Sequence, residues 1–408
     1  MRDRLLFTAS RFLWPIHNVV LLLAIGILLG ERALADYTYA LAVCAPLYFL
    51  ASFSLPIYMR TQGKRGFFRI ELAWLRVLSA AATIPLVGAV SLITPSTQAN
   101  VFVALWVLKL GDIVFDSVPV YFSARTSDKH RGAKLFLLDG LRVLLAQAAL
   151  WSCLLFLQKG IVVLLLGVGS INLVVSTCIL LAVPSWFGSH IGLARFLAIL
   201  RRLVRRATPM TISGALLAFL ISLPRLLSEP HLTDPERAVF GLAQTIGSGV
   251  ALLFNGIWLY EFHRIQDSFR AGQLRRLLSI NLLLTLIFLS LLIGTSIAML
   301  VAQPTLFSLM HISAPATLLF PVLIVLLGLQ HCISVHRDTL KLASHEWTEV
   351  RILVASLGAA TVVHFGVVYL AGASWPWSVA AMCLVAALVQ VLLSYVALSE
   401  RLRARPRA

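Results

Sequence analysis

The chain alternates long apolar runs with short polar segments. Each run holds about 20 mostly apolar residues, which is the length that an α-helix needs to cross the hydrocarbon core of a bilayer. Few charged residues interrupt the runs. The pattern therefore predicts twelve membrane-spanning helices. Their expected positions are residues 12–30, 37–59, 71–94, 100–122, 135–157, 160–184, 207–228, 238–260, 277–301, 314–336, 352–370 and 374–398.

The longest polar break in this series is the segment SWFGSHIGLARFLAILRRLVRR, residues 185–206. Its arginines interleave with apolar residues, so a helix here has one apolar and one cationic face. Such a helix lies in the plane of an anionic membrane surface rather than across it. A plain basic connecting loop is the alternative. The expected domains are therefore an N-terminal six-helix bundle (1–184), a cytoplasmic amphipathic linker helix (185–206), a C-terminal six-helix bundle (207–398) and a basic cytoplasmic tail (399–408).

Composition and charge point to the same class of protein. Hydrophobic residues make up 59% of the chain, charged residues make up 12%, and the mean hydropathy is +0.90, far outside the soluble range. The net charge of +17 gathers at both ends of the chain and in alternate connections, whereas the intervening connections hold only Arg32, Lys159 and Arg237. This positive-inside pattern predicts cytoplasmic termini. Membrane topology thus accounts for the charge, and nucleic acid is not an expected partner.

The sequence gives no sign of a metal, disulfide or nucleotide site. The cysteines lie inside apolar runs without the spacing of metal ligands, so we expect neither a disulfide framework nor a metal site. No Gly-rich phosphate loop is present, so ATP-driven transport within this chain is not expected. We therefore expect no cofactor. The cysteines in question are Cys44, Cys153, Cys178, Cys332 and Cys383.

The N-terminus also fits a different interpretation. Basic residues at positions 2 and 4, an apolar run and the small residues of Ala33-Leu34-Ala35 together resemble a cleaved signal peptide. However, Pro15, His17 and Asn18 interrupt the apolar run, and the run is long enough to span a bilayer. We therefore expect a first membrane span rather than a signal peptide.

The two halves of the chain carry a short internal repeat. Arg11 precedes Pro15 at the start of the first predicted span, and Arg205 precedes Pro209 at the start of the seventh with the same spacing. The second and eighth spans open on the similar sequences YALA and FGLA. Both pairs of spans run in the same direction. The halves are therefore expected to be parallel repeats, related by a pseudo-two-fold axis along the membrane normal.

Three charged residues fall within the fourth predicted span: Lys109, Asp112 and Asp116. Their offsets of three and four place them on one helical face. Each charge at this depth costs about 2.5–3.5 kcal/mol on insertion scales, so we expect them to face a bundle interior or a wet cavity. In a functional interpretation, Lys109 attracts an anionic substrate, and Asp112 or Asp116 exchanges a coupling proton or cation. In a structural interpretation, Lys109 and Asp112 form an ion pair, and Asp116 is bonded near the inner side.

Polar residues in the first and seventh spans are further candidates. His17 and Asn18 follow Pro15, which frees a backbone carbonyl, and histidine titrates near neutral pH. A packed, neutral histidine is the simpler interpretation. Arg225 lies near the outer end of the seventh span, where it either lines a cavity or pairs with Glu229.

Two arginines lie closer to the cytoplasmic side. The side chains of Arg76 and Arg142 are expected to snorkel to the surface, with a role in a cavity as the alternative. Arg142 also lies three residues from Asp139, so the two can pair. The full set of candidates comprises Lys109, Arg225, His17, Asn18, Arg142 and Arg76 for substrate binding or cavity lining, and Asp112 and Asp116 for ion coupling.

Several sequence segments resemble a known family. Leu29-Gly30-Glu31, followed by DYTYALA at 36–42, is similar to the polysaccharide transporters, or O-antigen-type flippases, of the multidrug/oligosaccharidyl-lipid/polysaccharide (MOP) exporter superfamily. The segment LPRLL at 223–227 is similar to the family's Asp-Arg-x-Leu, with Pro224 in place of the Asp. Phe240-Gly241 departs from the family's Gly-x-Tyr order. The resemblance implies a MOP-type fold with twelve helices in two six-helix bundles.

The resemblance also implies a function. It indicates an alternating-access flippase that moves undecaprenyl-pyrophosphate-linked oligosaccharide across the bacterial inner membrane for surface or exopolysaccharide synthesis. Lipid-linked oligosaccharide, membrane lipid and a polysaccharide polymerase or export machinery are the implied partners. One alternative is a cation-coupled multidrug or metabolite antiporter of the same superfamily. A membrane polymerase or glycosyltransferase is less expected, because the outer connections are too short and too poor in charge for a catalytic site. The chain is therefore not expected to be an enzyme.

Overall fold

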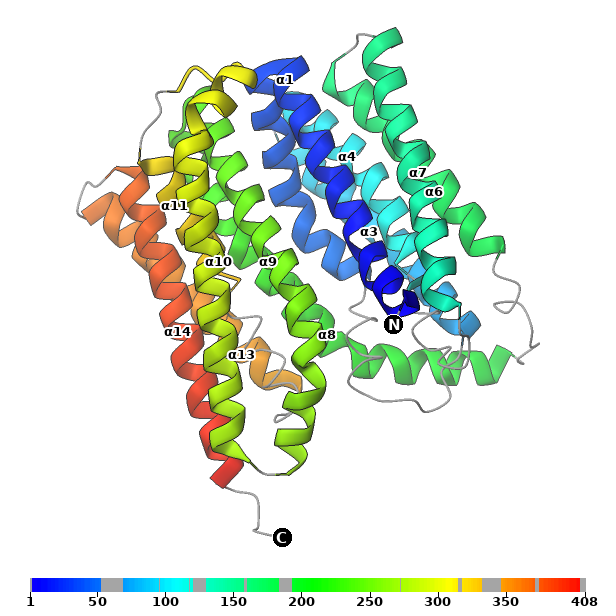
Figure 1. The fold of residues 1–408 in the computed structure, drawn as a ribbon, viewed down its shortest axis with the longest axis vertical. Coiled ribbons are helices and arrows are strands. Elements are labelled where there is room, and N and C mark those ends of the chain that lie inside the picture. Colours follow the sequence, from blue (N-terminus) through cyan, green and yellow to red (C-terminus); the bar gives the residue numbers. More distant parts are fainter. Residues whose placement is uncertain are drawn as a thin grey trace. The chain divides into compact units, whose positions relative to one another are not determined.

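The computed structural model shows an all-helical chain (Figure 1). No strand occurs in the part that it describes. Eight described helices are long and apolar enough to cross a membrane, and two shorter apolar helices, Leu78–Leu92 and Leu319–Leu329, accompany them. The expected all-α class is therefore confirmed. The described residues are 2–52, 69–94, 96–116, 118–119, 130–157, 160–182, 193–271, 273–314, 318–331, 346–370 and 374–403.

The first helix, α1 (Arg2–Ser52), contains the first two predicted spans and one sharp break at Gly30. A straight helix of its 51 residues would be about 76 Å long, against a hydrocarbon core of about 30 Å. Gly30 adopts φ 84° and ψ −179°, a conformation that only glycine takes without strain. Figure 1 shows the two arms of α1 running back from this turn. The expected loop over residues 31–36 was wrong, because Leu34 and Ala35 are buried in helix.

Two compact units divide the chain, Met1–Ala215 and Leu216–Ala408. The described part of the first unit contains both arms of α1, four further helices and the first part of α8. The start of α1 is fixed to α6, because Asp3 Oδ1 accepts hydrogen bonds from the backbone N–H groups of Gly132 (2.9 Å) and Ala133 (3.1 Å). This carboxylate caps the helix N-terminus and complements its dipole. The four helices are α3 (Arg69–Ile93), α4 (Ser96–Phe115), α6 (Arg131–Ser152), which continues as a π-helical turn at Cys153–Leu157, and α7 (Ile161–Ala182).

Helices α4 and α7 cross at very short range because glycines face each other's helix. A Cβ atom built on Gly169 of α7 would lie 2.8 Å from the backbone nitrogen of Leu108 on α4. A Cβ atom on Gly111 of α4 would lie 2.4 Å from Asn172 Nδ2 on α7. Small residues permit this close packing of membrane helices, where lipid gives no hydrophobic drive to associate. The crossing also holds Asn172 against α4, which matters for the site described below.

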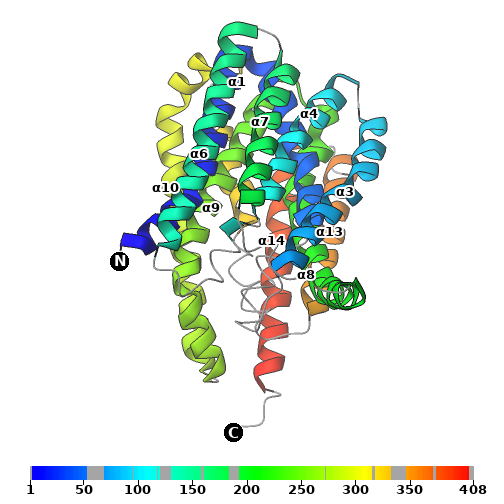
Figure 2. The same ribbon diagram turned by 90° about the vertical axis from the view of Figure 1, so that its right-hand side faces the viewer.

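The predicted linker helix and the seventh predicted span are one helix, α8 (Leu193–Ser228). Figures 1 and 2 show that its first turns run across the direction of α6 and α7, at the end of unit 1 where the chain begins. The helix bends before it enters the bundle, where Ala207 and Met210 are buried. Residues 185–192 of the expected linker lie outside the described residues. The expected end of the linker helix at residue 206 falls inside this continuous helix.

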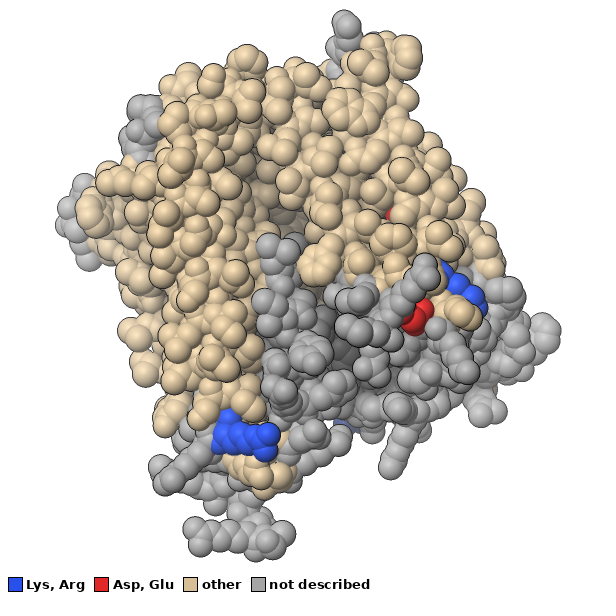
Figure 3. Space-filling view, in the orientation of Figure 1, with Lys and Arg blue, Asp and Glu red and all other residues tan. Residues whose placement is uncertain are grey.

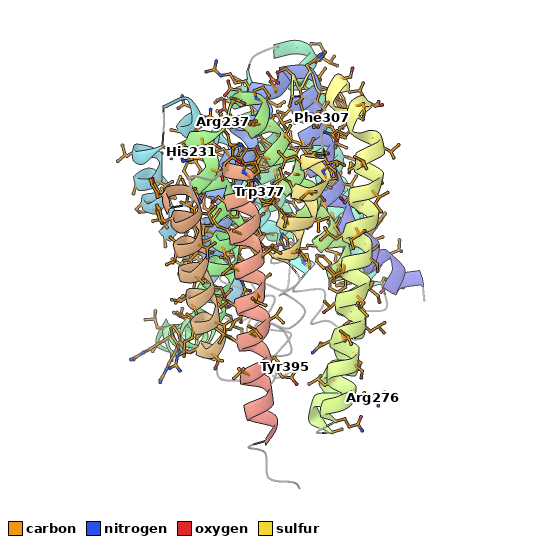
Figure 4. The ribbon with its side chains drawn as sticks, turned by 90° about the vertical axis from the view of Figure 1, so that its left-hand side faces the viewer. His231, Arg237, Arg276, Phe307, Trp377 and Tyr395 are labelled. Atoms are coloured by element: carbon orange, nitrogen blue, oxygen red, sulfur yellow. The ribbon has the colours of Figure 1, made fainter. Side chains whose placement is uncertain are left out.

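The second unit holds the rest of α8 and the later helices. Its core includes edge-to-face ring pairs between Phe254 and Phe288 and between Phe307 and Phe320. Figure 4 shows Phe307 at the end of this unit that also carries His231 and Arg237, with Arg276 and Tyr395 at the other end. The helices are α9 (Asp234–Arg270), α10 (Leu274–Leu309), α11 (Leu319–Leu329), α13 (Glu346–Phe365), which continues as a π-helical turn at Gly366–Leu370, and α14 (Trp375–Arg403).

Helices α9 and α10 of this unit run well past their predicted ends. Helix α9 extends to Arg270 through the polar stretch expected as a connection at 261–276, and α10 continues through Pro304 to Leu309. Polar residues outside the membrane can also form helix, so a change from apolar to polar sequence does not by itself end a helix.

The described outer faces are rich in exposed apolar side chains such as Leu92 and Val301. On the face shown in Figure 3, few charged side chains lie on the described surface. Such a surface suits contact with lipid.

Candidate functional site: a buried charge cluster in unit 1

The candidate site is a set of charged and polar side chains buried between α1, α4, α6 and α7. Helix α4 contributes Lys109 and Asp112, α6 contributes Arg142, and α7 contributes Asn172. We call these four residues, together with Asp139 of α6, the charge cluster. The i,i+3 spacing on α4 places Lys109 beside Asp112, and the glycine-mediated crossing of α4 and α7 brings Asn172 into reach.

Asp112 is the centre of the charge cluster. Its Oδ1 accepts hydrogen bonds from Arg142 Nη2 at 2.5 Å and from Asn172 Nδ2 at 3.2 Å, and its Oδ2 accepts one from Lys109 Nζ at 3.0 Å. Asn172 Nδ2 also donates to the backbone carbonyl of Leu108 at 2.9 Å. Charge-assisted bonds of this kind are among the strongest in proteins. Both oxygens of Asp112 are therefore engaged by cations.

Arg142 is held on every side. Its Nε donates to Asn172 Oδ1 at 2.7 Å, and its Nη1 lies 3.6 Å from Asp139 Oδ1. The guanidinium carbon lies 3.6 Å from the ring centroid of Trp14 and 4.3 Å from that of Phe115, so two aromatic rings flank the cation. The side chain is only 3% exposed. The expectation that Arg142 snorkels to the surface was therefore wrong, because it has carboxylate, amide and ring partners inside the unit.

The edge of the charge cluster is less buried than its centre. Lys109 is 17% exposed, and its ammonium lies 5.9 Å from the ring centroid of Tyr48 on α1. Tyr48 donates a hydrogen bond to Asp116 Oδ2 at 2.7 Å. Asp116 is half-buried, one turn beyond Asp112 on α4. Lys109 is thus paired with Asp112 and lies beside Tyr48, whose hydroxyl is bonded to Asp116.

A third face of the site comes from the first arm of α1. His17 is fully buried with its ring centroid 4.6 Å from that of Trp14, and it lies within electrostatic reach of Asp112, Arg142 and Lys109. Within the described part of the chain, neither nitrogen of the His17 ring has a hydrogen-bond partner, and the same holds for Trp14 Nε1 and Asn18 Oδ1. Unsatisfied polar atoms inside a membrane unit are rare and mark functional candidates.

Arg225 lies in the other unit, in a separate ion-pair network at the turn between α8 and α9. Its side chain has no exposed surface; its Nε is 3.1 Å from Glu229 Oε2, and Nη1 donates to the backbone carbonyl of Arg237 at 2.7 Å. Arg237 in turn pairs with Glu229 at 3.2 Å and with Asp234 at 3.0 Å. The expected pair with Glu229 therefore forms. In this structure Arg225 holds the turn between α8 and α9 through its ion pair and its hydrogen bond.

The structure thus brings together Lys109, Asp112, Arg142 and His17, whereas Arg225 lies elsewhere. The side chain of Arg76 lies outside the described residues. Sequence reasoning missed Asn172, although a lone amide in an apolar span was a usable signal. It had no means of pairing Tyr48 with Asp116, which is 68 residues away. Among the described residues, no group of three His, Cys, Asp or Glu side chains could hold a metal ion.

Fold and site together define a multi-pass membrane protein with a buried, charge-balanced cluster. The fold is shared with MATE family transporters of the MOP superfamily. An inward-facing multidrug resistance MATE transporter is 16% identical, with a TM-score of 0.66 over 97% of this chain and 96% of that one. An outward-facing one is 15% identical, with a TM-score of 0.67 over 99% and 97%. A MATE structure in a straight conformation is 13% identical, with a TM-score of 0.64 over 99% of this chain and 95% of that one.

These neighbours confirm the MOP-type fold with twelve helices in two bundles. No protein-family model matches the sequence. No curated protein matches it at a significant level. The similarity therefore lies in the fold, along nearly the whole chain, rather than in the sequence.

Proposed function

We propose that the protein is a cation-coupled exporter that moves organic solutes across the membrane by alternating access. The fold supports this proposal, because it matches inward-facing and outward-facing forms of a multidrug resistance transporter over nearly all of the chain. In this interpretation the multidrug or metabolite antiporter takes precedence over the flippase that the sequence resemblance implies.

The observation that carries the proposal is the charge balance of the buried cluster. Lys109 and Arg142 face Asp112 and Asp139, so two cations meet two carboxylates inside a membrane unit. Losing either carboxylate charge leaves an uncompensated buried cation, which is strongly unfavourable. A proton that binds Asp112 would therefore release Lys109, whose ammonium already lies beside Tyr48. Proton binding to Asp112 would in this way make the Lys109 ammonium available to a solute.

We assign roles to the remaining candidates on the same basis. Lys109, at the half-buried edge, is the cation that meets an anionic part of the solute. Asp112 and Asp116 are the carboxylates that exchange the coupling ion, and His17 and Asn18 supply polar atoms on the α1 face. Arg142 holds Asp112 in place. Arg76 and Arg225 remain candidates for cavity lining as sequence-based predictions.

Efflux assays test this function directly. The full chain is expressed in a bacterial strain that lacks its main efflux pumps, and accumulation of ethidium and norfloxacin is measured with and without a proton or sodium gradient. We expect lower accumulation with the wild-type chain and no difference from the empty vector for Lys109→Ala. Arg225→Ala is expected to reduce efflux while still inserting. Wild-type efflux by both variants would exclude both residues from a role in transport.

The lipid-linked oligosaccharide flippase is the second candidate, favoured by the sequence resemblance around the α1 turn, LGE and DYTYALA. For that substrate, cations such as Lys109 would face the pyrophosphate, while the isoprenoid tail stays in lipid. Deleting the gene and analysing surface glycan and lipid-linked intermediates separates the candidates. Accumulated intermediate with lost surface glycan favours the flippase, and a polymerase partner would then be sought. Unchanged glycan together with lost drug efflux favours the exporter.

The proposal also includes the orientation. We propose a bacterial inner membrane location with both termini in the cytoplasm, supported by the positive-inside distribution of Lys and Arg. Fusions of a periplasm-active phosphatase and of a cytoplasm-active fluorescent protein to residue 408 report the side of the C-terminus. Phosphatase activity in the first fusion would contradict the assignment.

A further inference from the structure

The transverse first turns of α8 carry an open groove of about 690 Å³. Its described lining is Leu197, Arg201, Val204 and Arg205. Residues 197, 201 and 205 follow each other at intervals of four, and 204 lies three residues after 201 and seven after 197, so all four share one face of the helix. The groove therefore combines two guanidinium groups with two apolar side chains on a single stripe.

Among the described residues, no carboxylate neutralises the two arginines of the groove. Arg201 and Arg205 are both exposed, and neither has an ion pair or hydrogen bond in the described part of the chain. By contrast, the described arginines of the two buried networks, Arg142 and Arg225, are each paired with carboxylates. One helical turn separates the two groove arginines, about 6 Å along the axis. Two such guanidinium groups can bind one phosphodiester from both sides.

The apolar part of the groove distinguishes a lipid from a soluble anion. Leu197 is 52% exposed and Val204 is 36% exposed on the same face as the arginines. Exposed apolar side chains beside unpaired cations suit a molecule that has a phosphate next to hydrocarbon. The helix also lies across the direction of its bundle, as a helix in the membrane interface does (Figure 2).

We propose that this groove binds the headgroup of an anionic phospholipid, with the phosphate between Arg201 and Arg205 and the upper acyl chain on Leu197 and Val204. Because α8 continues unbroken into the buried turns at Ala207 and Met210, the bound lipid fixes the position of the helix entering the bundle. The proposal concerns a lipid site and is independent of what the protein transports.

Native mass spectrometry of the purified full chain tests the proposal. Delipidated protein in neutral detergent is titrated with phosphatidylglycerol and, separately, with phosphatidylcholine of the same acyl chains. Each basic residue near an anionic surface is worth about fivefold in binding, so Arg201→Gln/Arg205→Gln should weaken phosphatidylglycerol binding by about 25-fold. Arg276→Gln is the matched control, because Arg276 is an exposed arginine on α10 of the other unit. It should bind as the wild type does.

Three outcomes would overturn the proposal. Equal binding of phosphatidylglycerol and phosphatidylcholine would exclude a site that selects an anionic headgroup. Unchanged phosphatidylglycerol binding by the double variant places the lipid elsewhere. Displacement of the lipid by excess inorganic phosphate alone, with no dependence on acyl chains, assigns the groove to a soluble anion. If the glutamine variant does not fold, Arg201→Lys/Arg205→Lys replaces it, because lysine keeps the charge. A Leu197→Ser/Val204→Ser variant tests the apolar half of the site, and its phosphatidylglycerol binding should be weaker than that of the wild type.

Discussion

Replacing Arg142 with glutamine should destabilise unit 1 more than any other single change in the charge cluster. The guanidinium contacts Asp112, Asn172 and Asp139 and lies between two aromatic rings. Its removal leaves two buried carboxylates with only Lys109 as a cation. Removing one partner of a buried ion pair costs about 3–5 kcal/mol. For a unit of about 200 residues each kcal/mol lowers Tm by about 2–4 °C, so the lower end of this cost gives a fall of about 6–12 °C.

The buried thiol of Cys44 offers a local assay for this change. Cys44 is 1% exposed in unit 1, with its Sγ 4.0 Å from the backbone carbonyl of Phe102. In a full-length protein that retains only this cysteine, a thiol-reactive fluorescent dye reports the unfolding of unit 1 on heating. Arg142→Lys serves as a control, since it keeps the charge but loses the planar fork, and it should fall between the wild type and Arg142→Gln.

A double-mutant cycle decides whether the ion pair is responsible. Arg142→Gln/Asp112→Asn removes both charges of the central pair, so the loss should be smaller than the sum of the two single losses. If the two losses simply add, or if Arg142→Gln changes Tm by less than about 2 °C, then the guanidinium acts by packing alone and the reasoning from charge balance fails.

Three further predictions follow from other features. Asp112→Asn and Asp116→Asn should each remove the dependence of efflux on the ion gradient in proteoliposomes; unchanged dependence in both would assign them to structure. Gly169→Val should lower the Tm of unit 1, since its Cβ would lie 2.8 Å from a backbone nitrogen; an unchanged Tm would show that the helices can separate at no cost. Burial raises the pKa of the Glu236 carboxyl. Hydrogen bonds from Thr233 and Trp375 outweigh this effect, so the pKa lies below the usual value for glutamate. Its contribution to stability is therefore present above pH of about 4.5 and is lost as pH falls through the lower folded pKa; thermal unfolding of wild type and Glu236→Gln across this window should converge at low pH.

The apolar runs predicted the membrane helices because a span must be both long and apolar. Their ends were harder to predict, since α1 and α9 continue through polar residues that cost nothing outside the bilayer. The spacing of Lys109 and Asp112 was enough to predict their pair, because one helix fixes it. The burial of Arg142 was not predictable in this way. Asp139 on the same helix was predictable as a partner, but the partners Asp112 and Asn172 come from α4 and α7. The close crossing of those helices, which depends on glycine contacts far apart in sequence, brings these two partners together.

The division between the two units lies at Ala215 and Leu216, inside the hydrogen-bonded turns of α8. Anyone who wishes to produce the halves separately should not cut there, because a break at residue 215 would leave two frayed ends, each missing four of its backbone partners. A cut ahead of Leu193 keeps the whole of α8 in the second fragment. Co-expressed halves divided at that position are therefore the better choice for complementation or for split-reporter assays.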